Sequence, residues 1–152
     1  MSLTDDAYKA LVEVLGEDFI TDDLAVTQAY SRCFLSTASR PPKCVALPAR
    51  VEEIQEIFRL ANRFDFKVIP TGSHLQRTCE PYLKTYDYLT IDPKRMDGIQ
   101  VYPDDMYAVV EPYTTFARLQ VEAMKHGLTC YIPTGGAQTS VVANLVYQGF
   151  NI

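Results

Sequence analysis

The chain has 152 residues, of which 47% are apolar and 22% are charged, and its formal net charge is −5. This length and composition are typical of a soluble globular protein with one core of ordinary size. The negative charge excludes a general attraction to nucleic acid or to an anionic membrane surface. Apolar runs stay well below the ~20 residues that would span a bilayer, and the acidic N-terminus does not resemble a signal or transit peptide, so we expect a cytoplasmic protein.

The cysteines and histidines do not predict a metal centre. Four cysteines lie far apart, at positions 33, 44, 79 and 130, and none forms a C-x-x-C pair. His74 and His126 are the only histidines in the sequence. We therefore expect reduced, structural cysteines and no metal site.

The first 43 residues are predicted to be helical and then irregular. Thr4 or Asp5 can cap a first helix that stops at Gly16. Its apolar residues recur about every four positions, which gives it one buried face: Leu3, Ala7, Leu11 and Leu15. A shorter capped helix or turn is expected over residues 21–31, and residues 36–43 are a loop by composition.

A strand–helix–strand pattern follows. "CVALP" and "KVIP" are short strands, and "RVEEIQEIFRLANRFD" between them is a helix. This spacing predicts a right-handed crossover, hence a parallel pair of strands with the helix packed across it. The helix face expected to pack inward consists of Val51, Ile54, Ile57, Phe58, Ala61 and Phe64. Glu52, Glu53 and Glu56 are expected on its solvated side.

Strands then dominate the sequence before two further helices. "DYLTID", "IQVY" and "MYAVVEP" are predicted strands, and "PDD" turns between the last two. Thr114 or Thr115 can cap the helix "FARLQVEAMKH", which Gly127 ends. A Gly-Gly turn and a final helix from Val141 to Tyr147 follow. The predicted fold class is α+β.

Four segments, taken in order, carry a family resemblance: "PARVEEIQEIFRLANRF", "YLTIDPKRMDGI", "YAVVEPYTTFARL" and "IPTGGAQTSVVANLVYQG". They resemble the FAD-binding domain of the vanillyl-alcohol oxidase and p-cresol methylhydroxylase flavoprotein family over roughly residues 44–149. The resemblance implies an FAD-binding fold of the p-cresol methylhydroxylase type. Residues 1–43 would then be an N-terminal helical segment, 44–112 the first, βαβ-containing subdomain, and 113–152 the incomplete start of the second.

The resemblance also implies where FAD would bind. The loop after "KVIP" would hold the pyrophosphate with its N–H groups. The residues that match this loop are Pro70, Thr71, Gly72, Ser73 and His74. A second segment would lie along the cofactor and contains Pro133, Gly135, Gly136, Ser140, Val141, Asn144 and Gly149.

The sequence departs from the family pattern in the pyrophosphate loop. After Gly72 the expected glycine-rich run is replaced by "SHLQRTCEPY", whose side chains keep the backbone farther from an anion. Arg77 would restore part of the attraction and Glu80 would oppose it. Tyr113 and Ala143 stand at two other positions where the pattern prefers glycine. We interpret the loop as a phosphate-binding loop in which the glycine-rich run has been partly replaced by other residues.

Several single residues keep alternative interpretations. His74 fits a covalent flavin link, a noncovalent FAD contact or an ordinary loop histidine, and Cys130 fits a flavin-linked or an inert buried thiol. Gly135 and Gly136 suit either close backbone approach to the cofactor or a plain tight turn. Asn144 suits either a hydrogen bond to the flavin or a local backbone contact.

Two classes of function follow. The first is the FAD-binding portion or subunit of a flavin-dependent oxidoreductase that transfers a hydride from an organic substrate to the flavin. The second is a non-catalytic interaction module that keeps the scaffold, has lost FAD binding, and pairs with another chain or with itself. In this family most groups that react near the flavin come from later segments, so no catalytic residue is assigned and enzymatic activity of this chain alone stays open. A piece of a longer enzyme is a third option.

Overall fold

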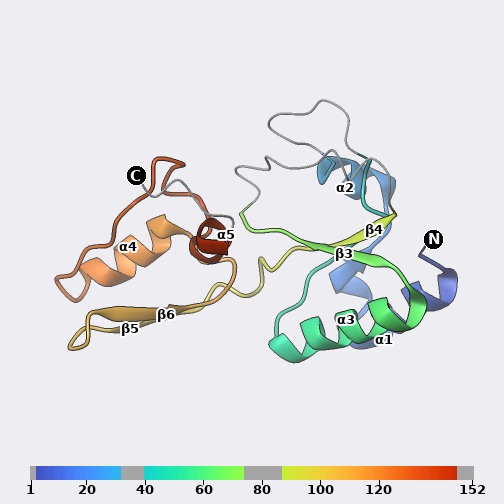
Figure 1. Cartoon of the computed structure of the whole chain (residues 1–152), viewed down its shortest axis with the longest axis horizontal. Coiled ribbons are helices and arrows are strands. Elements are labelled where there is room, and N and C mark those ends of the chain that lie inside the picture. Colours follow the sequence, from blue (N-terminus) through green and yellow to red (C-terminus); the bar gives the residue numbers. More distant parts are fainter. Residues whose placement is uncertain (1–2, 32–39, 74–86, 147–152) are drawn as a thin grey trace. The chain divides into compact units, whose positions relative to one another are not determined.

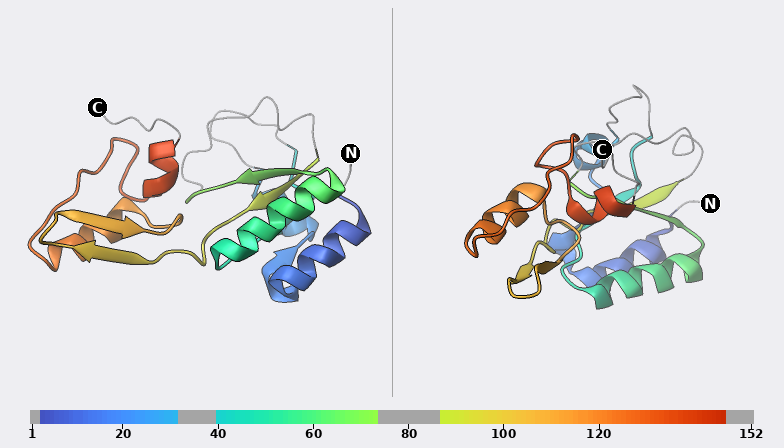
Figure 2. Two further views of the ribbon diagram at one scale, coloured as in Figure 1. Left: turned by 60° about the horizontal axis from the view of Figure 1, so that its bottom comes forward. Right: turned by 60° about the vertical axis from the view of Figure 1, so that its left-hand side comes forward.

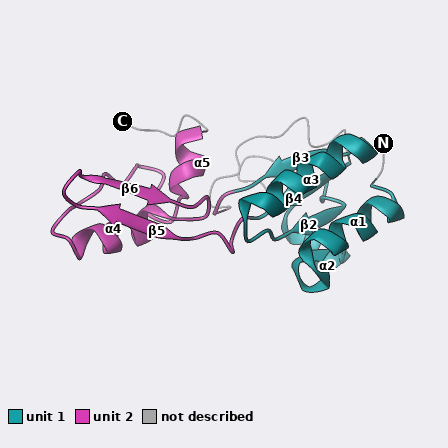
Figure 3. Cartoon of the chain, turned by 90° about the horizontal axis from the view of Figure 1, so that it is seen from below, with its two compact units in different colours: residues 1–71, 77–92 teal, residues 72–76, 93–152 magenta. Residues whose placement is uncertain are grey.

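The computed structural model describes residues 3–31, 40–73 and 87–146 (Figure 1). The chain forms two compact units, coloured separately in Figure 3. Unit 1 contains residues 1–71 and 77–92, and unit 2 contains residues 72–76 and 93–152. The domain boundaries expected from the sequence stay a prediction.

Unit 1 is built on a four-stranded sheet in the order β1-β2-β4-β3. Its strands are β1 (Ile20–Thr21), β2 (Cys44–Ala46), β3 (Lys67–Pro70) and β4 (Tyr88–Ile91). Strands β2, β4 and β3 are parallel, whereas β1 pairs with β2 in the antiparallel direction. The sheet explains why β4 is buried throughout: a strand flanked on both sides in a parallel sheet is buried on both faces.

The order of the strands corrects one prediction. β2 and β3 are parallel, as expected from the strand–helix–strand spacing, but they are not neighbours because β4 lies between them. All four residues of β4 are buried, and this fully buried strand occupies the centre. The short edge strand β1 was not predicted, because two residues carry no readable alternation.

Helices α1 (Asp5–Leu15), α2 (Leu24–Ala29) and α3 (Val51–Phe64) belong to unit 1, together with the 3₁₀ turn η1 (Glu17–Phe19). The predicted caps of α1 are confirmed: the Thr4 hydroxyl accepts from the Ala7 N–H at 3.3 Å, and Gly16 has φ +87°. α1 packs alongside α3 (Figure 2). The core that they form with the sheet contains Ala7, Leu11, Leu15, Ile20, Cys44, Ala46, Ile57, Leu60, Ala61, Phe66, Leu89 and Ile91.

Two predictions about α3 are wrong. Val51 and Phe58 are exposed rather than packed inward, because the buried face of α3 is centred on Ile57 and Leu60. Glu53 is buried rather than solvated. Its carboxylate accepts from the Ala49 N–H at 2.8 Å and pairs with Arg50 at 2.8 Å. The side chain therefore caps the N-terminus of α3, in a way similar to the glutamate of a capping box.

Unit 2 contains a β-hairpin and two helices. Strands β5 (Ile99–Tyr102) and β6 (Tyr107–Val110) are antiparallel, and the rings of Tyr102 and Tyr107 stack at 4.6 Å between centroids. Helix α4 (Phe116–Met124) packs against β5. Helix α5 (Val141–Val146) follows the Gly-Gly turn. The predicted hairpin, its turn and both helices are therefore confirmed within the described residues.

No helix in residues 3–31, 40–73 and 87–146 is long and apolar enough to cross a bilayer. The same residues contain no group of three or more His, Cys, Asp or Glu side chains that could hold a metal ion. The cytoplasmic location stays a prediction.

Candidate functional site

The loop that follows β3 begins on a rigid strand. Pro70 is the last residue of β3 and lies opposite Ile91 of β4. The Thr71 backbone N–H donates to the Ile91 carbonyl at 2.9 Å, and the Thr71 hydroxyl donates to the same oxygen at 3.0 Å. Thr71 is therefore held by the sheet, and its own N–H is already used by a protein acceptor.

Gly72 and Ser73 continue the loop within unit 2. The Ser73 hydroxyl accepts from the Ser140 N–H at 3.1 Å. Among the described residues, no acceptor is found for the N–H groups of Gly72 and Ser73 themselves. Within the described part of the loop, these two amides are available to an anion.

The Gly-Gly turn closes on itself. The Gly136 N–H donates to the Pro133 carbonyl at 3.0 Å, and the Thr139 N–H donates to the Gly136 carbonyl at 3.1 Å. Gly136 has φ +103°, a conformation that suits glycine and strains other residues. The Gly135 carbonyl accepts from the Thr139 hydroxyl at 3.3 Å. This geometry favours the tight-turn interpretation of Gly135 and Gly136.

Ser140 and Val141 anchor the start of α5. The Ser140 side chain is fully buried, and its hydroxyl donates to the Pro112 carbonyl at 2.6 Å and accepts from the Ala143 N–H at 3.3 Å. The Val141 N–H donates to the Thr114 carbonyl at 2.8 Å. The polar groups of Ser140 that were predicted to face FAD are thus bonded inside the protein.

Asn144 differs from its neighbours because one of its polar atoms is unused. Its side chain is 9% exposed, and its Oδ1 is buried with no hydrogen-bond partner in the described parts of the chain. A buried acceptor without a partner costs about 1–3 kcal/mol. A ligand donor at this position would remove that cost.

Two of the predicted site residues, His74 and Gly149, lie outside the described residues, as do Arg77 and Glu80 of the same loop. Their proposed roles stay predictions. Cys130 is described: its backbone N–H donates to the Gln120 Oε1 at 3.0 Å, and its Sγ lies 3.4 Å from the same oxygen. Burial raises the pKa of the Cys130 thiol, which favours the inert thiol over the reactive thiolate.

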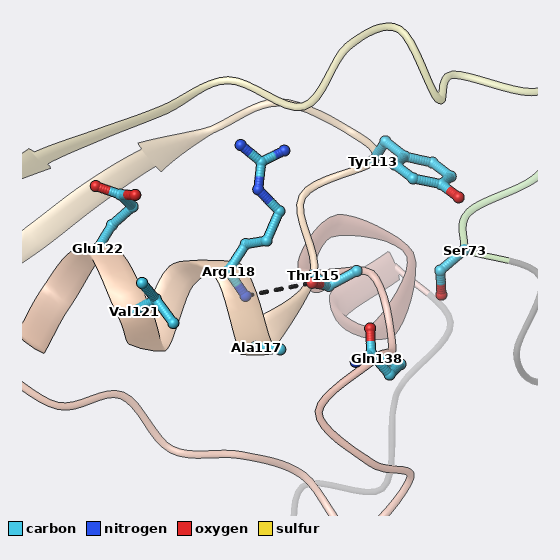
Figure 4. Close-up of a pocket in the computed structure, with 8 residues that line it drawn as sticks. All are labelled: Ser73, Tyr113, Thr115, Ala117, Arg118, Val121, Glu122 and Gln138. Carbon is cyan, nitrogen blue, oxygen red and sulfur yellow. Dashed lines mark hydrogen bonds between the residues drawn. The ribbon is translucent and has the colours of Figure 1, made fainter.

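A cavity of about 460 Å³ opens in unit 2 next to Ser73 (Figure 4). Ser73 and Tyr113 lie at one end of it, and Val121 and Glu122 lie at the other. Its remaining lining residues are Thr115, Ala117, Arg118 and Gln138. Sequence reasoning singled out Ser73, Tyr113 and Thr115. It missed the four lining residues of α4, because helix residues that line a cavity have no distinctive spacing, and it missed Gln138 in the turn before α5.

The charged groups of this cavity are already paired. Arg118 forms an ion pair with Asp97, and Glu122 pairs with Lys125 at 2.7 Å. The hydrogen bond from Lys125 lowers the pKa of the Glu122 carboxyl. The first N–H groups of α4 are also used, since those of Phe116, Ala117 and Arg118 donate to protein oxygens. The start of α4 is therefore not an anion site.

This fold, with its loop after β3 and its second segment before α5, is that of an FAD-binding domain of the p-cresol methylhydroxylase type. Residues 42–150 match the family described as the FAD binding domain. The chain belongs to this family, and FAD is its cofactor. Comparison with curated proteins finds no match.

The solved structures that are similar to the chain include three enzymes. p-Cresol methylhydroxylase with substrate bound aligns at a TM-score of 0.80 with 19% identity, and 4-ethylphenol oxidase from Gulosibacter chungangensis in complex with isoeugenol aligns at 0.82 with 22% identity. Both alignments cover 95% of this chain. Alkyldihydroxyacetonephosphate synthase aligns at 0.80 with 18% identity over 93% of this chain. This chain covers 29% of the length of each of these three proteins.

Proposed function

We propose that this chain is the FAD-binding portion of a flavin-dependent oxidoreductase, in which the loop after β3 takes the diphosphate. The observation that carries the proposal is the match of residues 42–150 to the FAD binding domain family. The structural relatives include p-cresol methylhydroxylase and 4-ethylphenol oxidase, whose names denote oxidation of phenols. When bound, FAD would supply the acceptor for a hydride from an organic substrate.

The described residues fit a dinucleotide. The N–H groups of Gly72 and Ser73 are free of protein acceptors within the described residues, and glycine at 72 lets the backbone approach an anion closely. The buried Oδ1 of Asn144 would accept from a ligand donor. Pro70 and Thr71, fixed on β4, would hold the loop in place.

The other predicted residues would act indirectly. Pro133, Gly135 and Gly136 would shape the turn before α5, and Ser140 and Val141 would hold the start of that helix. A covalent link between His74 and the flavin is tested by denaturing the protein and measuring its mass. A mass without flavin would contradict the link. We assign no catalytic residue to this chain.

Titration of the purified protein with FAD tests the proposal. We expect the visible absorption of FAD to shift and its fluorescence to change at a saturable stoichiometry. ADP shares the diphosphate with FAD and should compete for the site, whereas FMN has a single phosphate and should compete more weakly. A colourless protein that takes up no FAD at any concentration tested would contradict the proposal.

A second candidate function is an interaction module that pairs with another chain or with a second copy of itself. The observation that favours it is the exposed apolar surface of the hairpin: Met106, Tyr107 and Val109 are 79%, 49% and 56% exposed. Exposed apolar residues that cluster on one element are typical of contact surfaces. Static light scattering tests this candidate, because an associating protein has a mass that rises with concentration and a monomer does not.

A further inference from the structure

Two segments that are far apart in the sequence meet within unit 2. Gly72 and Ser73 leave the loop after β3, and residues 140–143 begin α5. The hydrogen bond from the Ser140 N–H to the Ser73 hydroxyl joins them across 67 positions of sequence. Both segments belong to the FAD site proposed above, so a fixed distance between them would define one binding surface.

The two segments also approach each other closely at Gly72. A Cβ placed on Gly72 would lie 2.7 Å from the Ala143 Cβ and 3.2 Å from the Ser140 Cβ. Carbon atoms in proteins attract at about 3.5–4.0 Å and repel strongly below that distance. A side chain at position 72 therefore needs one of these two neighbours to move.

Neither neighbour is free to move. Ala143 lies inside α5, and its only side-chain carbon is the Cβ, so no flexible end can turn away. Ser140 is fully buried, and its hydroxyl is bonded to both the Pro112 carbonyl and the Ala143 N–H. The contact is therefore set by backbone positions on both sides.

The backbone conformation does not explain the glycine. The glycines with positive φ in the described residues are Gly16, Gly127 and Gly136, and Gly72 is not among them. The φ angle of Gly72 is thus outside the left-handed region that favours glycine. What position 72 requires is the absence of a Cβ opposite Ala143.

We propose that Gly72 and Ala143 are a size-matched pair of positioning residues for FAD. The missing side chain at 72 makes room for the methyl group at 143. Together with the Ser73–Ser140 hydrogen bond, the contact holds the N–H groups of Gly72 and Ser73 beside the start of α5, where they face one diphosphate. This inference rests on the proposed function.

A double-mutant cycle tests the pair. Gly72→Ala should weaken FAD binding at least about tenfold, because a displaced amide loses a charge-assisted hydrogen bond to the diphosphate. Ala143→Gly alone removes the methyl group that lies against Gly72 and should weaken FAD binding about threefold, less than Gly72→Ala does. The double variant should recover most of the lost affinity, with the 3.2 Å approach to Ser140 leaving a smaller remainder.

Each protein is measured in two ways: FAD affinity by fluorescence titration, and thermal unfolding without FAD. Gly98→Ala is the matched control, because the three atoms nearest to its added Cβ all belong to the flexible Glu111 side chain, whose carboxylate accepts from the Gly98 N–H at 2.7 Å. We expect FAD to bind this control as tightly as it binds the wild type. If Gly72→Ala does not fold, the double variant decides: folding and FAD binding support the pair, and failure to fold overturns it.

Ser73 provides an independent arm. Ser73→Ala removes the acceptor of the Ser140 N–H and should weaken FAD binding about fivefold to tenfold. Ser73→Thr keeps the hydroxyl and should restore the affinity, which a loss of general stability would not predict.

The outcomes separate the two proposals. A wild-type protein that binds no FAD overturns the proposed function and this inference with it. A wild-type protein that binds FAD, with Gly72→Ala binding equally tightly or with no recovery in the double variant, overturns the positioning pair alone. Loss in Gly72→Ala and recovery in the double variant, in both affinity and thermal unfolding, supports it.

Discussion

The thiol of Cys44 shows how burial changes the chemistry of a single residue. Cys44 is fully buried in β2, and burial raises the pKa of its thiol from 9.0 to about 12, with the Asp22 carboxylate adding to the shift. The folded chain keeps the proton on this thiol over a pH range in which the unfolded chain loses it. In that range the folded state binds more protons, so its stability falls as pH rises.

We therefore predict that the free energy of unfolding falls between pH 9 and pH 12 more steeply in the wild type than in Cys44→Ala. Urea unfolding at a series of pH values measures both slopes. Tyr8, whose pKa is raised by burial, by Asp22 and by Cys44, is present in both proteins, and the part of its shift that Cys44 causes is counted with the effect of Cys44. Identical slopes in the two proteins would show that Cys44 does not contribute.

Single residues also show where local sequence rules stop. The helix cap at Thr4 and the left-handed Gly16 were predictable, because each depends on residues within one helical turn. The burial of Glu53 was missed although its partners Ala49 and Arg50 are equally local, because the carboxylate was assigned to the solvated helix face rather than to the cap of the helix. Nor could the sequence indicate that Gly72 contacts Ala143.

The first N–H groups of α4 are hydrogen-bonded to protein oxygens. The Thr115 hydroxyl accepts from the Arg118 N–H at 3.3 Å, while the N–H groups of Phe116 and Ala117 donate to the Thr139 and Ala137 carbonyls. The segment before α5 thus supplies acceptors to α4. This arrangement ties the cap of one helix to the turn that leads into the next.

We predict that Thr115→Ala lowers the free energy of unfolding by about 1 kcal/mol, the usual cost of losing a side-chain N-cap. Thr115→Ser keeps the hydroxyl and is the control. Urea unfolding followed by circular dichroism measures both variants. If the alanine and serine variants are equally stable, the capping hydrogen bond does not contribute to stability.

The hairpin β5–β6 is one of the elements of unit 2 that carry exposed apolar residues. Tyr107 and Val109 lie on the same, exposed face of β6, and Val109 lies opposite the exposed Gln100 of β5. Met106 precedes them with φ +53°, a left-handed conformation that is uncommon for this residue type. A hairpin of this kind has only two strands in the described structure, so both of its edges can accept another strand.

For the whole molecule, the interaction-module candidate predicts association through this hairpin. Static light scattering should then show a mass that rises with concentration, and Val109→Lys should shift the protein toward the monomer. Leu24→Lys adds the same charge at a 69% exposed position of α2 in unit 1 and should leave the mass unchanged. A wild-type protein that stays monomeric at every concentration argues against this candidate.

The whole chain corresponds to one part of the larger proteins that it resembles. The chain matches the FAD binding domain family over residues 42–150, yet it covers 29% of the length of the similar solved structures. An FAD site can be built from the described residues.

The sequence by itself determined the α+β class, most helices and strands, and the family, because periodicity, caps and motif order are local properties that survive without contacts. The two segments expected to approach FAD stay a prediction. Only the tertiary structure decided that β4 lies between β2 and β3, that the Ser140 hydroxyl is used inside the protein, and that Gly72 faces Ala143. These facts depend on which distant residues share space, and that is fixed by packing of the whole chain rather than by any short stretch of it.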